Sequence, residues 1–441
     1  MRNTTEENLK SEAGPRQSFF IERCLLAFIV VLSSGAIMHF LFGAPVSKTL
    51  GAPRPGYFSG LLGDYSNFAT EFLYVVVGVV LTLRLVSRNA MRGAIRGFRR
   101  NVILVSFFAL ALLSSQWSFS PLGSVKRSLA LLLLMYFAVV FSESFSMKEQ
   151  RRIVGLTLFG IVAASLVFEL GRRFTGMGAY SMRWCGLFTQ KNGFGWAAGL
   201  GLLCFLPGSW APRESGGFTL KVRALAIFVF AVAIVLSGSV GAIVAVACSF
   251  LVFMSSQLLR SDKPAWCYPV GGLAILTELG GGLAVAVWPS GILQWLGRDA
   301  TLTGRTELWS GLLDCLSRRP FLGLGYASFW TPHENPFLHE IWQSTGYVLF
   351  SAHNGYLEVA LGCGIVGLVL LAVFLMCYFL RAQRYFWVFS DRAAAAWPIS
   401  VLAFMVVGNA VHSMFFEFNE VRWFFFLLVF VQLKGAMSDY E

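Results

Sequence analysis

Long apolar runs, repeated from residue 19 to residue 434, constrain this chain more than any other feature of its sequence. Runs of roughly 15 to 25 apolar residues can cross the hydrocarbon core of a bilayer as α-helices. We predict twelve such spans, at residues 19–42, 68–86, 102–117, 125–142, 153–171, 193–207, 222–237, 240–258, 266–288, 355–380, 395–416 and 421–434. Hydrophobic residues make up 56% of the chain and charged residues 13%, which excludes a soluble globular protein. The prediction is an all-α polytopic membrane protein whose residues 1–441 form a single integral membrane domain.

The basic residues between the spans predict an orientation. Twelve spans place both termini on one side, and with that side cytoplasmic, 22 of the 35 Lys and Arg residues lie on it. The run from Arg84 to Arg100 contributes most, and the polar tail over residues 1–18 becomes cytoplasmic. Topology and contact with anionic membrane lipids account for the net charge of +12, so the charge indicates no nucleic-acid partner.

The basic residues on the outward side gather in two loops. The positive-inside rule disfavours them there, so two clusters indicate an anionic ligand held at the outer surface. The alternative for each side chain is that it only reaches from a helix end to the membrane interface. The clusters are Arg172, Arg173, Arg183 and Lys191, and Arg298, Arg305, Arg318 and Arg319.

Residues 289–354 form the longest polar stretch, and we predict a large outward loop that contains short helices and the active site. Thr303 is a candidate N-cap, and Arg318-Arg319-Pro320 is a typical helix stop, so a helix of about four turns is expected between them. Its apolar face is predicted to hold Arg305, Trp309, Leu312 and Leu316.

A guanidinium on that apolar face needs a partner. A phosphate or diphosphate suits the planar fork of Arg305. An internal salt bridge with Glu307 or Asp314 is the alternative, although neither residue lies on the same face of the helix.

His353 comes directly before the next span, with Asn354 as the candidate N-cap of that helix. The positive end of a helix dipole disfavours imidazolium, so a histidine here is expected to be neutral and able to accept a proton. A histidine at a helix start is more often structural, and only the arginine-bearing helix in the same loop favours a catalytic role.

Three further features of the loops carry little chemistry. Cys185 and Cys315 are the cysteines of the outward loops, and a disulfide between them is one possibility. The spacing of His333 and His339 matches no standard ligand pattern, and no metal site is predicted. Gly323-Leu324-Gly325 is expected to form a tight turn rather than a phosphate-binding loop, since Ser328 stands where the third glycine belongs.

Four motifs, in this order, resemble those of the superfamily of O-antigen ligases and O-antigen (exopolysaccharide) polymerases. They are Trp117-Ser118-Phe119-Ser120-Pro121 with Lys126-Arg127; Arg183 to Asn192; Gly304-Arg305 and Trp309 with Arg319-Pro320-x-Leu322-Gly323-x-Gly325; and Ala352-His353-Asn354 with Leu357. The resemblance covers roughly residues 100–380. One departure is Val240, since relatives often carry a cation at that position.

The resemblance implies an inverting, metal-independent glycosyltransferase of the GT-C type, without a cofactor, in the bacterial inner membrane. Its donor would be an undecaprenyl-diphosphate-linked glycan, used at the periplasmic face, and its acceptor a glycan or lipid A-core. Arg305, Arg183 and, more weakly, Lys191 are candidates to hold the diphosphate. His353 is the candidate base, with Asn354 and Trp309 in support.

Two other functions stay open. A ligase that transfers finished O-antigen to lipid A-core is hardly separable from a repeat-unit polymerase, although the His353-Asn354-Gly355-Tyr356-Leu357-Glu358 sequence slightly favours the polymerase. A transporter or flippase of lipid-linked glycans would use Glu71, Glu169 or Glu278 as an ion or proton site. Against it, the sequence shows no paired broken helices in two halves.

Overall fold

A computed structural model describes residues 19–36, 57–175, 183–188, 190–207, 220–259, 305–331, 334–346, 348–389 and 391–438. Over these ranges the chain forms helices and connecting segments, with no strand. Several predictions fall outside them: the tail 1–18, the span 266–288 with Glu278, the first part of the large loop with Arg298 and Thr303, and His333.

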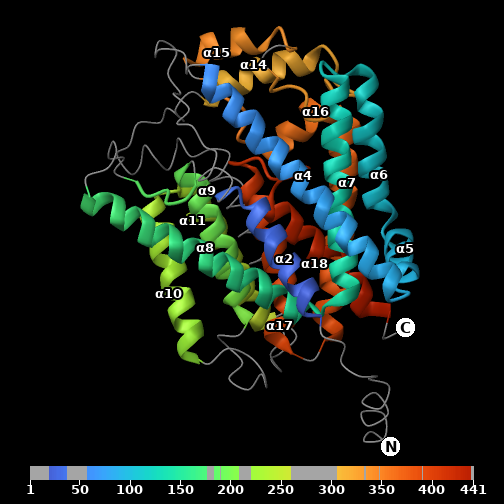
Figure 1. The fold of residues 1–441 in the computed structure, drawn as a ribbon, viewed down its shortest axis with the longest axis vertical. Helices are drawn as coiled ribbons and strands as arrows, with labels where there is room; N and C mark the ends of the chain where they lie inside the picture. Colours follow the sequence, from blue (N-terminus) through green and yellow to red (C-terminus); the bar gives the residue numbers. More distant parts are fainter. Residues whose placement is uncertain are drawn as a thin grey trace, which may run out of the picture.

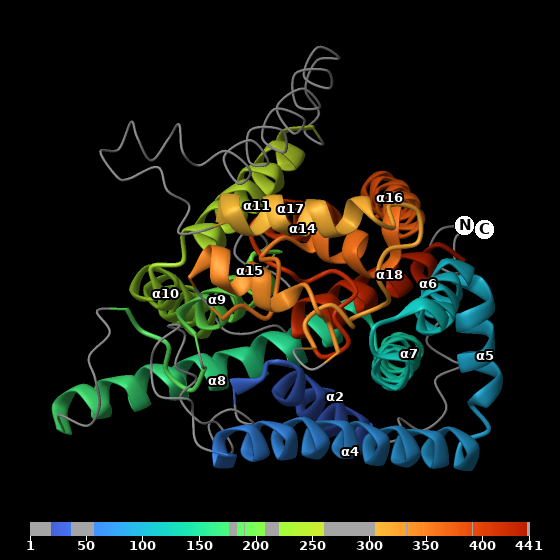
Figure 2. The same ribbon diagram turned by 90° about the horizontal axis from the view of Figure 1, so that it is seen from above.

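The helices form a bundle that is covered at one end by two short helices, α14 and α15 (Figure 1). Their bounds are α2 Phe20–Ser33, α4 Tyr57–Ser87, α5 Met91–Arg100, α6 Val102–Leu113, η1 Ser114–Trp117, α7 Pro121–Ser144, α8 Met147–Thr175, α9 Lys191–Phe205, α10 Leu220–Ser237, α11 Val240–Leu259, α14 Arg305–Ser317, α15 Leu338–Thr345, α16 Gly355–Val388, α17 Arg392–Asn409 and α18 Val421–Ser438. Seen from the covered end, α14 and α15 lie across the bundle, while α5 lies at its edge (Figure 2).

The predicted fold class is confirmed. Six of the described helices are long and apolar enough to cross a membrane, or seven if α5 and α6, bent by 81° at Asn101, count as one broken span. Eleven of the twelve predicted spans contain a described helix. Some of these are short, such as α9 with 15 residues, so the number twelve stays a prediction.

Two predicted spans contain a helix that ends early. In the first, which was expected to reach Phe42, α2 ends at Ser33 and Gly35 adopts a φ of 70°, while residues 37–42 lie outside the described ranges. The eleventh was expected to reach Phe416, but α17 ends at Asn409. The Asn409 side chain accepts hydrogen bonds from the backbone N–H groups of Met414 (3.0 Å) and Phe415 (2.9 Å), which holds residues 410–420 in a non-helical segment.

The long helix α16 is broken at Gly364, which has φ 63° and ψ −157°. A break inside a span frees backbone groups that must find other partners. The segment 320–325, which follows α14, supplies them through Leu324 N to Leu361 O (2.7 Å), Gly325 N to Gly362 O (3.1 Å), Ile365 N to Pro320 O (2.8 Å) and Val366 N to Phe321 O (3.2 Å). The Gly-Leu-Gly turn is therefore present, and its backbone pairs with the broken helix.

The glycines at this contact have a direct steric role. Gly323 and Gly364 both have positive φ, and a Cβ on either would lie within 2.6 Å of the other segment's backbone. Positive φ combined with such close backbone approach is open to glycine alone.

The Trp117 motif holds the other side of the same turn. The Trp117 indole donates to the Leu322 carbonyl (3.1 Å), and Arg319 donates to the Trp117 carbonyl (3.1 Å). Ser124 and Arg127, at the start of α7, donate to the carbonyls of Tyr326 (2.7 Å) and Ala327 (2.6 Å). Two of the four sequence motifs thus form one structural unit that anchors the end of α14 to the bundle.

Candidate active site

His353 lies in a short connection whose conformation is fixed from both sides. Its φ is 51°, a left-handed conformation that is uncommon and costly outside glycine. The indole of Trp309, on α14, donates to the Ala352 carbonyl (2.9 Å), and the Ala352 N–H donates to the Glu358 carboxylate (2.5 Å). The peptide groups before and after Ala352 are therefore both held.

Asn354 is the N-cap of α16, as its sequence position suggests. Its side-chain oxygen accepts hydrogen bonds from the N–H groups of Tyr356 (3.0 Å) and Leu357 (3.1 Å). Ser351 Oγ lies 3.3 Å from His353 Nδ1 and accepts from the His353 N–H at the same distance. The imidazole thus sits at the positive end of the first half of α16, ahead of the break.

A stack of rings joins His353 to α9 and to the segment between α17 and α18. The centroids of the His353 and His412 rings are 6.3 Å apart, and those of His412 and the buried Trp196 are 5.7 Å apart. The Arg422 guanidinium lies over the same indole, 5.8 Å from its centroid. Trp196 lies on α9, the helix that begins with Lys191, so the stack links His353 to the helix that follows the 183–192 motif.

Three cations from separate parts of the chain converge here. Burial lowers the pKa of the Lys191 ammonium, and the positive charges of Arg183 and Arg305 lower it further. Burial also lowers the pKa of the Arg305 guanidinium, which nevertheless stays charged. Within the described chain, Arg305 and Lys191 make no hydrogen bond or ion pair. Neither Glu307 nor Asp314 pairs with Arg305; both are exposed.

The loops that carry these cations are positioned by close packing. Trp184 N–H donates to the Leu236 carbonyl (3.2 Å), so the segment 183–188 follows the end of α10. A Cβ on Gly238, at the α10–α11 turn, would lie 3.4 Å from the Arg183 side chain. This turn is where Val240 departs from the family pattern, and Arg183 packs against it.

The other described basic residues of the two predicted clusters have contacts of their own. The candidate group is therefore reduced to Arg183, Lys191 and Arg305. Arg172 and Arg173 form ion pairs with the buried Glu169 at 2.7 and 3.3 Å, so that carboxylate serves as their counter-ion. On the large loop, the Arg318 guanidinium lies over the Phe337 ring at 4.3 Å. Arg319 is the residue that donates to Trp117.

The face of α14 differs slightly from the prediction. Leu308, Leu312 and Cys315 are its buried residues, while Arg305 and Trp309 are partly buried. The apolar stripe is therefore rotated by about one residue, and Arg305 lies at its edge. The disulfide that the sequence left as a possibility is not formed: Cys185 and Cys315 are both free thiols, and Cys315 packs in the apolar cluster under α14.

His412 has a strongly perturbed acid–base equilibrium. Burial lowers its pKa well below the ordinary histidine value, and the charges of Arg422, His353 and Arg305 act in the same direction. The ring stacked on His353 is therefore neutral at pH 7. Sequence reasoning missed this residue, because the predicted span 395–416 placed His412 inside a membrane helix.

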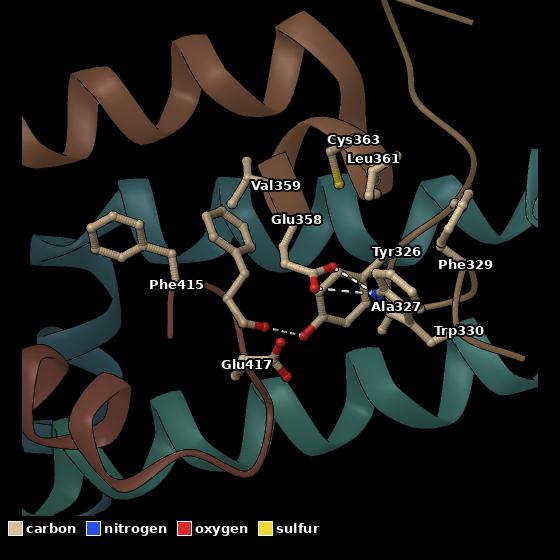
Figure 3. Close-up of a pocket in the computed structure, with 13 residues that line it drawn as sticks. Tyr326, Ala327, Phe329, Trp330, Glu358, Val359, Leu361, Cys363, Phe415 and Glu417 are labelled. Carbon is tan, nitrogen blue, oxygen red and sulfur yellow. Dashed lines mark hydrogen bonds between the residues drawn. The ribbon is translucent and has the colours of Figure 1, made fainter. Parts of the chain in front are cut away.

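A pocket lies beside Glu358, the carboxylate that also accepts from the Ala352 N–H (Figure 3). Aromatic rings and two carboxyl groups line it, among them Tyr326, Phe329, Trp330, Phe415, Glu358 and Glu417. Glu358 accepts hydrogen bonds from the Trp330 indole (2.9 Å) and from Ser413 (3.3 Å), and Tyr326 donates to the Phe416 carbonyl. Glu417 was not predicted from the sequence.

The fold and this site define a polytopic α-helical membrane protein in which the helix that begins at Arg305, a broken span and a histidine meet. Residues 225–372 match the protein family described as O-antigen ligase. This match supports the resemblance to the O-antigen ligase and polymerase superfamily, a family that generally implies an enzyme of the glycosyltransferase type.

A curated relative extends the match. The chain is 24% identical over 322 residues to the exopolysaccharide production protein ExoQ of Rhizobium meliloti (strain 1021). The aligned region covers 71% of this chain and 72% of that protein. The family match runs from within α10 past the break in α16.

Proposed function

We propose that this protein is an inverting glycosyltransferase that polymerises undecaprenyl-diphosphate-linked repeat units at the periplasmic face of the bacterial inner membrane, with both termini cytoplasmic. The observation that carries the proposal is that Arg183, Arg305 and Lys191 lie within electrostatic range of one another, and that Arg305 also acts on His412, whose ring stacks on His353. Within the described chain neither Arg305 nor Lys191 has a carboxylate partner, so this group of like charges favours a multiply charged anion, and a diphosphate has that charge.

In the proposed reaction the bond between the donor sugar's anomeric carbon and the diphosphate oxygen breaks. An acceptor hydroxyl oxygen forms the new glycosidic bond from the opposite face, which inverts the anomeric configuration. His353 takes the hydroxyl proton as a general base. The lipid diphosphate leaves with the bonding electron pair, and the three cations stabilise its growing negative charge. No metal or cofactor is assigned a role.

The roles of the supporting groups follow from the contacts. Trp309 holds the Ala352 peptide and Asn354 caps α16, so both position the imidazole rather than react. His412, kept neutral, stacks on His353 without adding a second positive ring.

The test is a transfer assay in proteoliposomes with a lipid-diphosphate glycan donor. We expect His353→Ala and Arg305→Ala each to abolish transfer while the protein stays folded in membranes. The matched control is Arg318→Ala, which removes an exposed arginine from the end of the same helix and should retain transfer. Full activity of His353→Ala, or a loss shared equally by Arg318→Ala, contradicts the assignment, and so does a strict Mg²⁺ requirement.

A ligase is the second candidate, because the matching family is described as O-antigen ligase, whereas the curated relative is named for exopolysaccharide production. Deletion in the source organism separates the two on one gel. A polymerase deletion leaves single repeat units, and a ligase deletion leaves long polymer on the lipid carrier.

A further inference from the structure

The short helix α5 carries a row of arginines that the proposed reaction does not use. Arg92, Arg96 and Arg99 are spaced at offsets of four and seven, so they share one face of the helix, and all three are exposed. Within the described residues none of them forms a side-chain hydrogen bond or an ion pair. This basic face of α5 is therefore open to an anion from outside the chain.

The rest of α5 shows where that anion comes from. Ala94 and Gly97 are buried, and a Cβ on Gly97 would lie 2.5 Å from the Val139 side chain of α7. Ile95, next to the basic face, is 49% exposed. Basic and apolar faces side by side are typical of a helix that lies in the plane of a membrane interface.

The position of α5 agrees with such a location. The axis of α5 is bent by 81° from that of α6, which follows it. At the far end of α6, the Trp117 indole donates to the Leu322 carbonyl, in the segment that follows α14. Helix α5 thus lies across the bundle axis, at the end opposite α14 and α15 (Figure 1).

Two cations from other helices meet the C-terminal end of α5. Nη1 of Arg381, on α16, donates to Asn101 Oδ1 (2.8 Å) and to the Phe430 carbonyl (3.1 Å), and the guanidinium lies over the Phe430 ring at 3.9 Å. Lys434, on α18, donates to the Arg100 carbonyl (2.5 Å). Three helices therefore each present a cation at one corner of the bundle.

No carboxylate of the described chain pairs with Arg381 or with the basic face of α5. The partners of Arg381 are an amide, a carbonyl and a ring, all neutral. Glu143, on α7, lies against α5, 3.5 Å from Cβ positions at Gly93 and Gly97, and it forms no ion pair with these cations. A guanidinium half-buried near the end of a span is costly without a counter-charge, so an external anion would stabilise this corner.

The surroundings favour a lipid over a soluble anion. Val102, directly after Asn101, and Leu380, directly before Arg381, are exposed apolar side chains. Trp387, near the end of α16, is also exposed, and tryptophan is enriched where membrane meets water. Basic sites between membrane helices at this level suit the headgroups of anionic lipids.

We propose that the basic face of α5, Arg381 and Lys434 bind the phosphate of an anionic phospholipid from the leaflet at this end of the bundle. The phosphate oxygens accept hydrogen bonds from the guanidinium groups, and the acyl chains lie along the exposed apolar residues of α6 and α16. The bound lipid holds α5 in the interface. The site is remote from α14 and does not depend on the proposed transfer reaction.

Native mass spectrometry of the full chain in detergent, with added lipid, measures the binding. The probes are dioleoyl phosphatidylglycerol, dioleoyl phosphatidylcholine, which has the same chains and no net charge, and inorganic phosphate. We expect the phosphatidylglycerol to bind about tenfold or more tightly than the phosphatidylcholine, and to stay bound in excess inorganic phosphate. Equal binding of the two lipids, or displacement by inorganic phosphate, overturns the inference.

A double variant tests the basic face of α5. Arg96→Gln/Arg99→Gln removes two exposed charges and should weaken phosphatidylglycerol binding on the order of 25-fold, since a basic residue at a membrane surface contributes about a factor of five. The matched control is Arg152→Gln/Lys221→Gln, which removes two exposed basic residues from α8 and from α10, on the side of the bundle away from α5 (Figures 1 and 2). It should bind the lipid as the wild type does, and an equal loss in the control would show attraction to total charge and overturn the site.

Arg381→Gln tests the contribution of α16. The glutamine amide keeps a donor for Asn101 but removes the charge, so phosphatidylglycerol binding should weaken about fivefold while phosphatidylcholine binding stays the same. Unchanged phosphatidylglycerol binding in this variant, or equal weakening of both lipids, overturns the assignment of Arg381 to the site.

Discussion

Replacing Trp309 by phenylalanine tests whether α14 positions His353. The substitution removes the indole N–H that donates to the Ala352 carbonyl at 2.9 Å and keeps an aromatic ring in the apolar cluster beneath the loop. Without that bond, the Ala352 carbonyl loses its partner, and the connection is held only by the Ala352 N–H on Glu358 and the His353 N–H on Ser351. The imidazole then samples orientations other than the reactive one.

The size of the effect follows from the bond that is lost. A neutral hydrogen bond of this kind contributes about 0.5–1.5 kcal/mol net. If the whole amount serves to orient His353, the turnover number falls by roughly 2- to 13-fold, since about 1.4 kcal/mol corresponds to a factor of ten. The KM for the lipid-diphosphate donor should stay unchanged, because Arg305 and Lys191 do not contact the indole N–H.

Trp342 offers a matched control in the same cluster. Its indole donates to the Leu349 carbonyl, also at 2.9 Å, but that carbonyl does not flank the histidine. We expect Trp342→Phe to lower the thermal unfolding midpoint about as much as Trp309→Phe, with less than a twofold change in turnover. Equal losses of turnover in the two variants, or none in Trp309→Phe, would refute the positioning argument.

Two other predictions concern the break in α16 and the cation cluster. Gly364→Ala should prevent stable accumulation of the protein in membranes, since φ is 63° and the new Cβ would lie 2.3 Å from Phe321 backbone atoms. Gly160→Ala is the control, because nothing lies within 4 Å of a Cβ at that position. Normal thermal stability of Gly364→Ala would contradict the steric argument. Pyrophosphate affinity, measured by calorimetry, should be highest below the lowered pKa of Lys191 and should fall as pH rises through that pKa, because a bound anion raises it. An affinity that does not change in the alkaline range would count against diphosphate binding at Lys191. So would an affinity that is the same in Lys191→Met.

The sequence predicted the parts of this fold that depend on composition and local chemistry. Apolar runs mark the spans because a bilayer demands long apolar helices. The stop at Arg318-Arg319-Pro320 and the cap at Asn354 are local signals, and α14 and α16 end and begin at them. Helical periodicity also predicted that Arg305 lies on a partly buried face of α14, and the observed face differs from the predicted one by about one residue.

What the sequence did not indicate depends on tertiary pairing. The break at Gly364 looks like any glycine in an apolar span, because only the backbone of residues 320–325 makes the break stable. Residues 410–416 are apolar enough to extend α17, and it is the Asn409 side chain that turns them away. His412 and Glu417 lie on this segment, which is why neither could be assigned in advance.

The pairing of residues 320–325 with residues 361–366 has a consequence for how such proteins can diverge. Backbone hydrogen bonds join the two ends of the chain between these segments. A change in the length of the intervening chain therefore does not displace its ends. Closing a longer flexible loop costs little, about 0.6 kcal/mol for each doubling. The stretch between Thr331 and Ser351 can therefore change in length while Gly325 and Asn354 remain in register with the membrane helix.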